Sequence, residues 1–167
     1  MIFATYAGTG KSFAAENLDK VLDMAIVPYK YKFPEEYTAE RFTESDKGCV
    51  EYPFDENYPE KYVADILKNI MEYEHILIPS DNRVMDVLDA QNVEYVLCHP
   101  ERSLKDEYQQ RYHERGNSEA FIRIFVDGWD VWMDSFEKRC CKKYVMHQGE
   151  YLLDVVEMYM EGNIGEA

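Results

Sequence analysis

Short apolar runs alternate with longer amphipathic segments along most of the chain. The apolar runs are rich in β-branched and aromatic residues and are bounded by proline, glycine or polar residues, which is typical of buried strands. We therefore expect strands at residues 2–6, 24–33, 75–79, 93–100 and 142–148.

Helical periodicity occupies most of the intervening chain. Between residues 12 and 25, apolar side chains recur at three- and four-residue intervals and predict one amphipathic helix; they are Ala14, Leu18, Val21, Leu22 and Ala25. Further helices are expected over 62–73, 83–91, 103–116, 119–126, around 129–136 and over 150–162.

The alternation of strands and helices predicts an α/β fold, in which helices cover both faces of a parallel sheet of five strands. Such sheets bind ligands at the carboxyl ends of their strands. Residues 34–61 are polar and proline-containing and show no strong period, so we expect an irregular excursion from the core there.

Composition narrows the range of functions. The 167 residues are expected to form one domain, and the 46% apolar content indicates a globular chain. There is no apolar run long enough to cross a membrane. The net charge of −15 disfavours a nucleic acid polymer as the main partner but is compatible with a small phosphorylated ligand.

Cysteine usage favours a reducing compartment. The four cysteines contain no C-x-x-C pair, so we expect reduced thiols and a cytoplasmic protein. A zinc site built from Cys140, Cys141 and His147 is the alternative interpretation.

The stretch TYAGTGKS, Thr5 to Ser12, carries the strongest chemical signal. A glycine-rich loop between a strand and a helix points backbone N–H groups at phosphates. Lys11 is expected to reach the β- and γ-phosphates of ATP, and Ser12 to hold Mg²⁺. Thr5 stands where the full pattern has glycine, which requires that its backbone stay extended. The predicted phosphate-binding residues are Ala7, Gly8, Thr9, Gly10, Lys11 and Ser12.

Arginines gather in a second segment, residues 100–117. Arg111 and Arg115 are four residues apart and share one helix face, and Arg102 precedes that helix. Arginine forks can neutralise charge on a transferring phosphoryl group. Salt bridges with nearby acids on a solvated helix are the alternative, and the phosphate loop favours the functional reading.

A third group follows the middle strand, in the stretch IPSDNR. Asp81 is either a ligand of Mg²⁺ or the cap of the next helix, and both readings stay open. Arg83 is a candidate for binding an acceptor phosphate. Tyr29, Tyr58 and Tyr62 could stack on a base, although tyrosines more often pack.

These residues resemble a known family. AGTGKS is similar to the phosphate loop of P-loop kinases, and most of the chain resembles the P-loop nucleoside monophosphate kinase-like, or adenylate kinase-like, proteins of bacteria and their phages. The stretch HPERSLKDEYQQRYHERGN is the most specific part of the likeness. In this family the position of Pro79 carries an acid, and Asp81 is displaced from it by two residues.

The resemblance implies a three-layer P-loop NTPase fold, a lid at residues 100–117 and an acceptor-binding insertion at residues 33–61 of one 1–167 domain. It implies phosphoryl transfer from ATP, with Mg²⁺, to a nucleoside monophosphate or similar acceptor. A nucleotide-binding module without transferase activity and a kinase for a non-nucleotide substrate are the alternatives.

Overall fold

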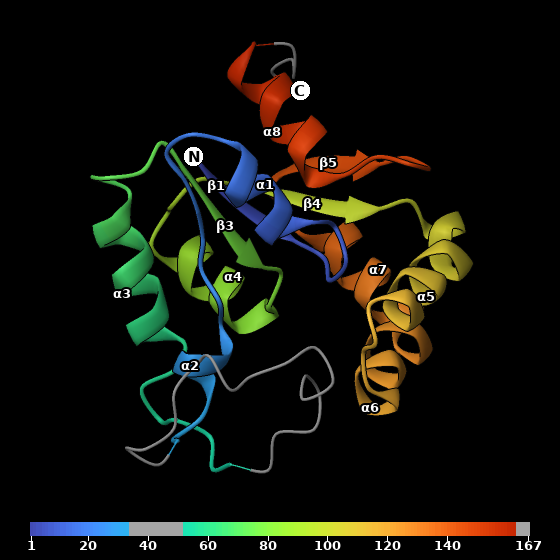
Figure 1. The fold of residues 1–167 in the computed structure, drawn as a ribbon. Coiled ribbons are helices and arrows are strands. Elements are labelled where there is room, and N and C mark those ends of the chain that lie inside the picture. Colours follow the sequence, from blue (N-terminus) through green and yellow to red (C-terminus); the bar gives the residue numbers. More distant parts are fainter. Residues whose placement is uncertain (34–51, 163–167) are drawn as a thin grey trace.

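The computed structural model describes residues 1–33 and 52–162 of the chain. In this part, a five-stranded sheet has the order β2-β3-β1-β4-β5, and every neighbouring pair is parallel (Figure 1). The strands are β1 (Ile2–Thr5), β2 (Val21–Asp23), β3 (His75–Pro79), β4 (Tyr95–Pro100) and β5 (Lys142–Met146). The all-parallel sheet confirms the predicted α/β class.

Helices connect the strands and lie against both faces of the sheet (Figure 1). They are α1 (Lys11–Asn17), α2 (Val27–Lys30), α3 (Glu60–Asn69), α4 (Asn82–Ala90), η3 (Arg102–Leu104), α5 (Lys105–Glu114), α6 (Glu119–Ile122), η4 (Arg123–Asp127), α7 (Trp129–Lys138) and α8 (Leu152–Met160).

Alternate residues of each central strand enter different cores, because successive side chains of a strand point to opposite faces. Phe3 of β1 packs in a cluster with Ala14 of α1 and Val156 of α8, all fully buried. Ile2 and Ala4 pack on the other face with residues of α3, α4, α5 and α7. Two apolar layers therefore hold β1 in the middle of the sheet.

The second face is dominated by aromatic rings. Tyr6, directly after β1, makes edge contacts with Trp129 and Phe136 at centroid distances of 5.4 and 5.8 Å. Its hydroxyl donates to the Phe125 carbonyl oxygen at 2.6 Å. Edge-to-face pairs of this kind stabilise beyond the area that they bury. These contacts of Tyr6 hold α7 and η4 against the carboxyl end of β1.

The predicted helix over residues 12–25 is wrong in its second half. Helix α1 ends at Asn17, and residues 21–23 form β2, which pairs with β3 through Leu22 and Ile76. Lys20 has a φ of 55°, a left-handed conformation that ends regular helix. The two apolar residues of β2, Val21 and Leu22, fit the helical spacing as well as a short edge strand, and tertiary pairing decides between the two conformations.

The predicted strand over residues 24–33 is also wrong. Residues 27–30 form the short helix α2, in which Pro28 occupies the first turn. Proline is well tolerated there because the first N–H groups of a helix lack an intrahelical partner. Tyr31 then makes a single antiparallel bridge to Phe54. Much of the predicted 33–61 insertion, residues 34–51, lies outside the described residues.

In residues 1–33 and 52–162, no helix is both long and apolar enough to cross a membrane.

A matched pair of valines tests the assignment of the core. Val156→Ala on α8 removes methyl groups from a fully buried site and is expected to lower the free energy of unfolding by about 1–3 kcal/mol. Val131→Ala on α7, where the valine is 74% exposed, is expected to change it by less than about 0.5 kcal/mol. Urea denaturation measures both; equal losses would contradict the assignment.

Candidate functional site

The glycine loop, residues 6–10, leaves the carboxyl end of β1 and enters α1 at Lys11. Gly8 and Gly10 have φ values of 83° and 93°, which L-residues with a side chain rarely adopt. The strand–loop–helix context predicted for the motif is thus confirmed. Helix α1 is only seven residues long, and the loop is also held by contacts from other parts of the chain.

Three consecutive carbonyl oxygens of the loop accept hydrogen bonds from later parts of the chain. The Tyr112 hydroxyl donates to the Ala7 oxygen at 2.9 Å, and Arg111 Nη1 donates to the Gly8 oxygen at 3.3 Å. The Leu152 N–H, at the start of α8, donates to the Thr9 oxygen at 2.8 Å. Helix α5 therefore holds the loop at Ala7 and Gly8, and the start of α8 holds it at Thr9.

The orientation of the loop amides follows from these contacts. In a trans peptide the C=O of one residue and the N–H of the next point in opposite directions. Because the carbonyls of residues 7, 8 and 9 face α5 and α8, the N–H groups of Gly8, Thr9 and Gly10 face away from those helices. Successive N–H groups displayed in this way can form a concave anion site.

Gly8 is required by space as well as by conformation. A Cβ atom at this position would lie 2.8 Å from Cε1 of Tyr112, whose ring is fully buried. At Gly10, a Cβ atom would lie 3.3 Å from Cδ1 of Tyr151. The loop therefore packs closely against two aromatic rings.

Thr5 fits the position where the full motif has glycine. It belongs to β1, so its backbone is extended, as the sequence required, and its side chain is buried. The Thr9 hydroxyl donates to the Tyr6 carbonyl oxygen at 3.0 Å and lies 3.2 Å from the Thr5 hydroxyl. This contact ties the base of the loop to the end of the strand.

Lys11 and Ser12 share one carboxylate, that of Asp23 at the end of β2. Lys11 Nζ lies 3.3 Å from Asp23 Oδ1, and the Ser12 hydroxyl donates to Asp23 Oδ2 at 2.7 Å. The side chains of Lys11 and Asp23 are 21% and 19% exposed, so solvent screens this pair only partly. Parallel strand ends meet at one edge of the sheet, which explains the convergence.

The Ser12 hydroxyl and the Asp23 carboxylate supply oxygen ligands of the kind that Mg²⁺ prefers. The Oδ1 atom of Asp23 is buried and accepts no hydrogen bond from any described residue, although the Lys11 ammonium is near. A carboxylate oxygen in that condition, beside a serine hydroxyl, can take a hard cation. The sequence predicts Ser12 as a metal ligand, and the structure adds Asp23 as a candidate ligand beside it.

Asp81 caps α4. Its Oδ1 accepts the Arg83 N–H at 2.9 Å, which is the capping alternative, and its Oδ2 pairs with Lys30 Nζ at 3.2 Å. The Arg83 guanidinium lies 4.6 Å from the centre of the Phe54 ring. The carboxyl end of β3 thus holds an aspartate, a lysine and an exposed arginine together.

The three predicted base-stacking tyrosines differ in exposure. Tyr62 is fully buried, and its hydroxyl donates to the Met24 carbonyl oxygen at 2.7 Å. Tyr58 is 4% exposed, and Tyr29 is half-buried, in edge contact with Tyr62. Burial, and then the negative charge of Asp23, raises the pKa of Tyr62, so its hydroxyl stays protonated. Only Tyr29 offers an accessible ring surface.

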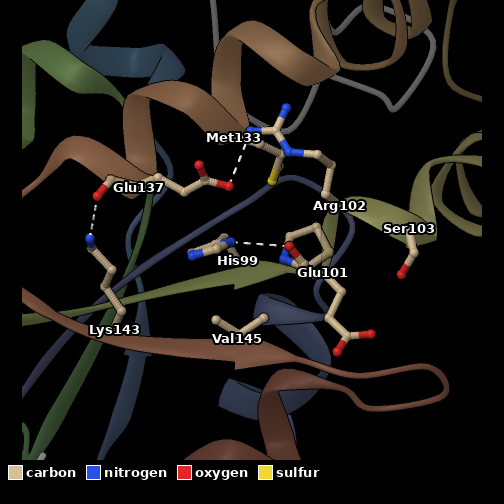
Figure 2. Close-up of a pocket in the computed structure, with 9 residues that line it drawn as sticks. His99, Glu101, Arg102, Ser103, Met133, Glu137, Lys143 and Val145 are labelled. Atoms are coloured by element: carbon tan, nitrogen blue, oxygen red, sulfur yellow. Dashed lines mark hydrogen bonds and ion pairs between the residues drawn. The ribbon is translucent and has the colours of Figure 1, made fainter.

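Arg102 does not join the loop. Its guanidinium pairs with Asp130, Asp134 and Glu137 of α7 at 2.6–3.1 Å. It lines a cavity of about 480 Å³ between β4, β5 and α7, which contains no loop residue (Figure 2). Figure 2 shows Glu137 between Arg102 and Lys143. For Arg102, the salt-bridge alternative is the one observed.

The same cavity contains His99. Its ring is buried, and Nδ1 lies 3.0 Å from the Pro100 carbonyl oxygen, which can only accept, so this nitrogen carries the proton (Figure 2). Burial lowers the pKa of His99, which keeps the ring neutral near pH 7. The ring lies against that of Phe136, with the ring centres 5.5 Å apart.

Arg111 is the predicted arginine that reaches the loop. Besides the Gly8 oxygen, its guanidinium contacts Glu107 and lies within 3.5 Å of the Glu150 oxygen. Arg115 follows α5 and is exposed. Helix α5 is docked by Tyr108 and Tyr112, which are 1% and 0% exposed. The predicted 100–117 lid thus packs onto the core in this structure.

The zinc alternative gains no support. Within the described ranges there is no cluster of three or more cysteine, histidine or acidic side chains suited to a metal ion. Cys140 is exposed and Cys141 is half-buried, and His147 pairs with Glu101 at 2.7 Å.

Sequence reasoning missed Asp23, Tyr112 and Tyr151. Asp23 was hidden by the wrong helix over residues 12–25; the available signal was an aspartate directly after two apolar residues, Val21 and Leu22. No local signal links the two tyrosines to a loop more than a hundred residues away.

Neither a protein-family model nor a curated protein matches this chain.

Alanine substitutions at Gly8 and Gly116 distinguish the cost of backbone strain from the cost of a steric clash. Gly116 has a φ of 73° with no atom within 4 Å of a Cβ position, so Gly116→Ala should cost only about 1–2 kcal/mol of backbone strain. Gly8→Ala adds the contact with the buried Tyr112 ring and should cost about 1–3 kcal/mol more. Urea denaturation gives both values. Equal losses would show that the loop does not pack against Tyr112 as described.

Proposed function

We propose that the protein binds ATP together with Mg²⁺ at the glycine loop and transfers the γ-phosphoryl group to a small phosphate acceptor, of which a nucleoside monophosphate is the leading candidate. The arrangement of a five-stranded parallel sheet with this loop after β1 is compatible with a three-layer, nucleoside monophosphate kinase-like P-loop fold.

One observation carries the proposal. The carbonyls of Ala7 and Gly8 are held by α5 and that of Thr9 by the start of α8, so each following N–H group points away from the contact that holds the carbonyl of its peptide. A polyphosphate is the common metabolite group that uses several adjacent N–H donors and an ammonium group at once. Lys11 and Ser12 follow directly in the chain.

Lys11 would exchange partners when a nucleotide binds. Its ammonium group pairs with Asp23, and a phosphate oxygen would compete for the same charge. Ser12 and Asp23 are the residues that would hold Mg²⁺, which supplies charge neutralisation on the phosphate oxygens. Asp23 would thereby keep a positive partner after Lys11 has turned to the nucleotide.

The acceptor would lie beyond the ends of β2 and β3. Lys30 and Arg83 supply positive charge there, and Tyr29 supplies a partly exposed ring. Asp81 holds Lys30 in place while it caps α4. Phosphoryl transfer needs positioning and charge neutralisation more than a strong base, so these groups are sufficient in kind.

A nucleotide-binding module without transferase activity is a second candidate, and one observation favours it. Arg102 is bound by three carboxylates, and Arg111 by Glu107 and two carbonyl oxygens. Neither arginine is thus available to a transferring phosphoryl group without losing these contacts. A kinase for a non-nucleotide acceptor is a third candidate, since Lys30 and Arg83 do not specify a base.

Turnover separates these candidates. The protein would be incubated with ATP, Mg²⁺ and each member of a panel of nucleoside monophosphates and non-nucleotide acceptors, and ADP and the phosphorylated products would be followed by chromatography. ADP formed in step with one diphosphate supports the nucleoside monophosphate kinase. ATP binding without turnover supports the module, and ADP formed only with non-nucleotide acceptors supports the third candidate.

Lys11→Ala tests the donor site. Loss of the ammonium group is expected to weaken ATP binding at least about tenfold, while the helical content measured by circular dichroism stays the same. Lys20→Ala is the control, because Lys20 is exposed and pairs with Glu74 at the surface. Unchanged ATP affinity in Lys11→Ala, measured by calorimetry, would refute the assigned role.

Asp23→Asn tests the metal assignment. The amide keeps the size of the side chain but removes its charge, so the affinity for ATP with Mg²⁺ should fall about tenfold. The affinity for Mg²⁺-free ATP should stay equal or rise, since Lys11 loses a competing partner. Asp19→Asn, an exposed aspartate nearby in the sequence, should change neither value. Parallel losses with and without Mg²⁺ would exclude Asp23 as a metal ligand.

A further inference from the structure

The guanidinium group of Arg111 is enclosed between two aromatic rings. Its central carbon lies 4.6 Å from the ring centre of Tyr108 and 4.3 Å from that of Tyr151. The side chain is 10% exposed. A planar cation in such a position is attracted by both ring faces and loses little further entropy on hydrogen bonding.

The guanidinium nitrogens of Arg111 also have hydrogen-bond partners. Glu107, one turn earlier on α5, binds Nη2, and the Gly8 and Glu150 carbonyl oxygens lie at 3.3 and 3.5 Å from the guanidinium nitrogens. The guanidinium thus connects α5, the turn before α8 and the glycine loop. Its contact with the loop is to a carbonyl oxygen, on the side opposite to the N–H groups.

We infer that Arg111 and Tyr112 are positioning residues: they hold the glycine loop in its nucleotide-binding shape by binding two consecutive carbonyls, and Arg111 does not touch the transferred phosphoryl group. The inference rests on the proposed function in one respect, which is that the ligand of the loop is taken to be a nucleotide. The hold on the loop is a property of the protein and can be tested separately.

The loop has a physical need for such support. Two glycines at positive φ leave residues 8–10 with a large conformational freedom, which costs free energy to restrict. The hydroxyl of Tyr112 and the fork of Arg111 fix peptides 7–8 and 8–9, and the Tyr112 ring fills the space beside Gly8. A loop restrained in advance binds its ligand without paying this cost at binding.

The first experiment uses no nucleotide. In Tyr112→Phe only the hydroxyl is lost, so the ¹⁵N order parameters of Gly8, Thr9 and Gly10 should fall from the rigid value of about 0.85 towards 0.6 or below. Tyr62→Phe is the matched control: it also removes a buried phenol–carbonyl hydrogen bond, from Tyr62 of α3 to Met24, but one that lies outside the loop. Unchanged order parameters in Tyr112→Phe, or an equal fall in both variants, would overturn the inference.

The second experiment measures binding by calorimetry. Arg111→Lys keeps the charge but loses the planar fork and the stacking. A positioning role predicts a loss of roughly fivefold that is equal for ADP and for a non-hydrolysable ATP analogue, because the loop holds phosphates common to both. Tyr112→Phe should show the same equal loss, and the surface control Lys20→Ala none.

The outcomes distinguish the two claims. A loss for the ATP analogue alone would mean that Arg111 touches the γ-phosphate, which overturns the positioning role. If the unaltered protein binds neither nucleotide, the proposed function fails, and the order parameters still decide whether Arg111 and Tyr112 hold the loop.

Discussion

The packing of the Tyr112 ring against Gly8, which has no Cβ atom, is the constraint on which the site depends. Only glycine leaves room for the ring at this position, and only a ring placed there brings its hydroxyl to the carbonyl of Ala7. The direction of that carbonyl decides where the next N–H points. A phosphate site in this chain is thus a product of side-chain packing behind the loop as much as of the loop sequence itself.

Charge is balanced locally throughout the site, although the chain as a whole is strongly acidic. Lys11 pairs with Asp23, Lys30 with Asp81 and Arg111 with Glu107, so each of these three cations has its own carboxylate. A polyphosphate entering this region would have to take cations away from carboxylates. A divalent metal ion that compensates the released carboxylate would therefore favour binding, as the proposal of Mg²⁺ requires.

The sequence predicted the class of fold, four of the five strands and the position of the glycine loop, because buried strands and amphipathic helices differ in period. It misplaced β2, since a three-residue edge strand is too short to show a period of its own, and tertiary pairing with β3 decides its conformation. Asp23 was missed for the same reason. The positions of Arg102 and Arg111 could not be predicted, because their partners lie on α7 and at the loop, and no local pattern encodes those distances.

The separation of partners along the chain sets an order of assembly. The carbonyls of Gly8 and Ala7 meet donors 103 and 105 positions later, and Thr9 meets Leu152 near the end of the described chain. Contacts so distant in sequence form late, because closing a long segment costs entropy before any contact repays it. The glycine loop would then reach its final shape only after helices α5 and α8 have been synthesised and packed. Loss of α8 would therefore impair a site that lies more than a hundred residues earlier in the chain.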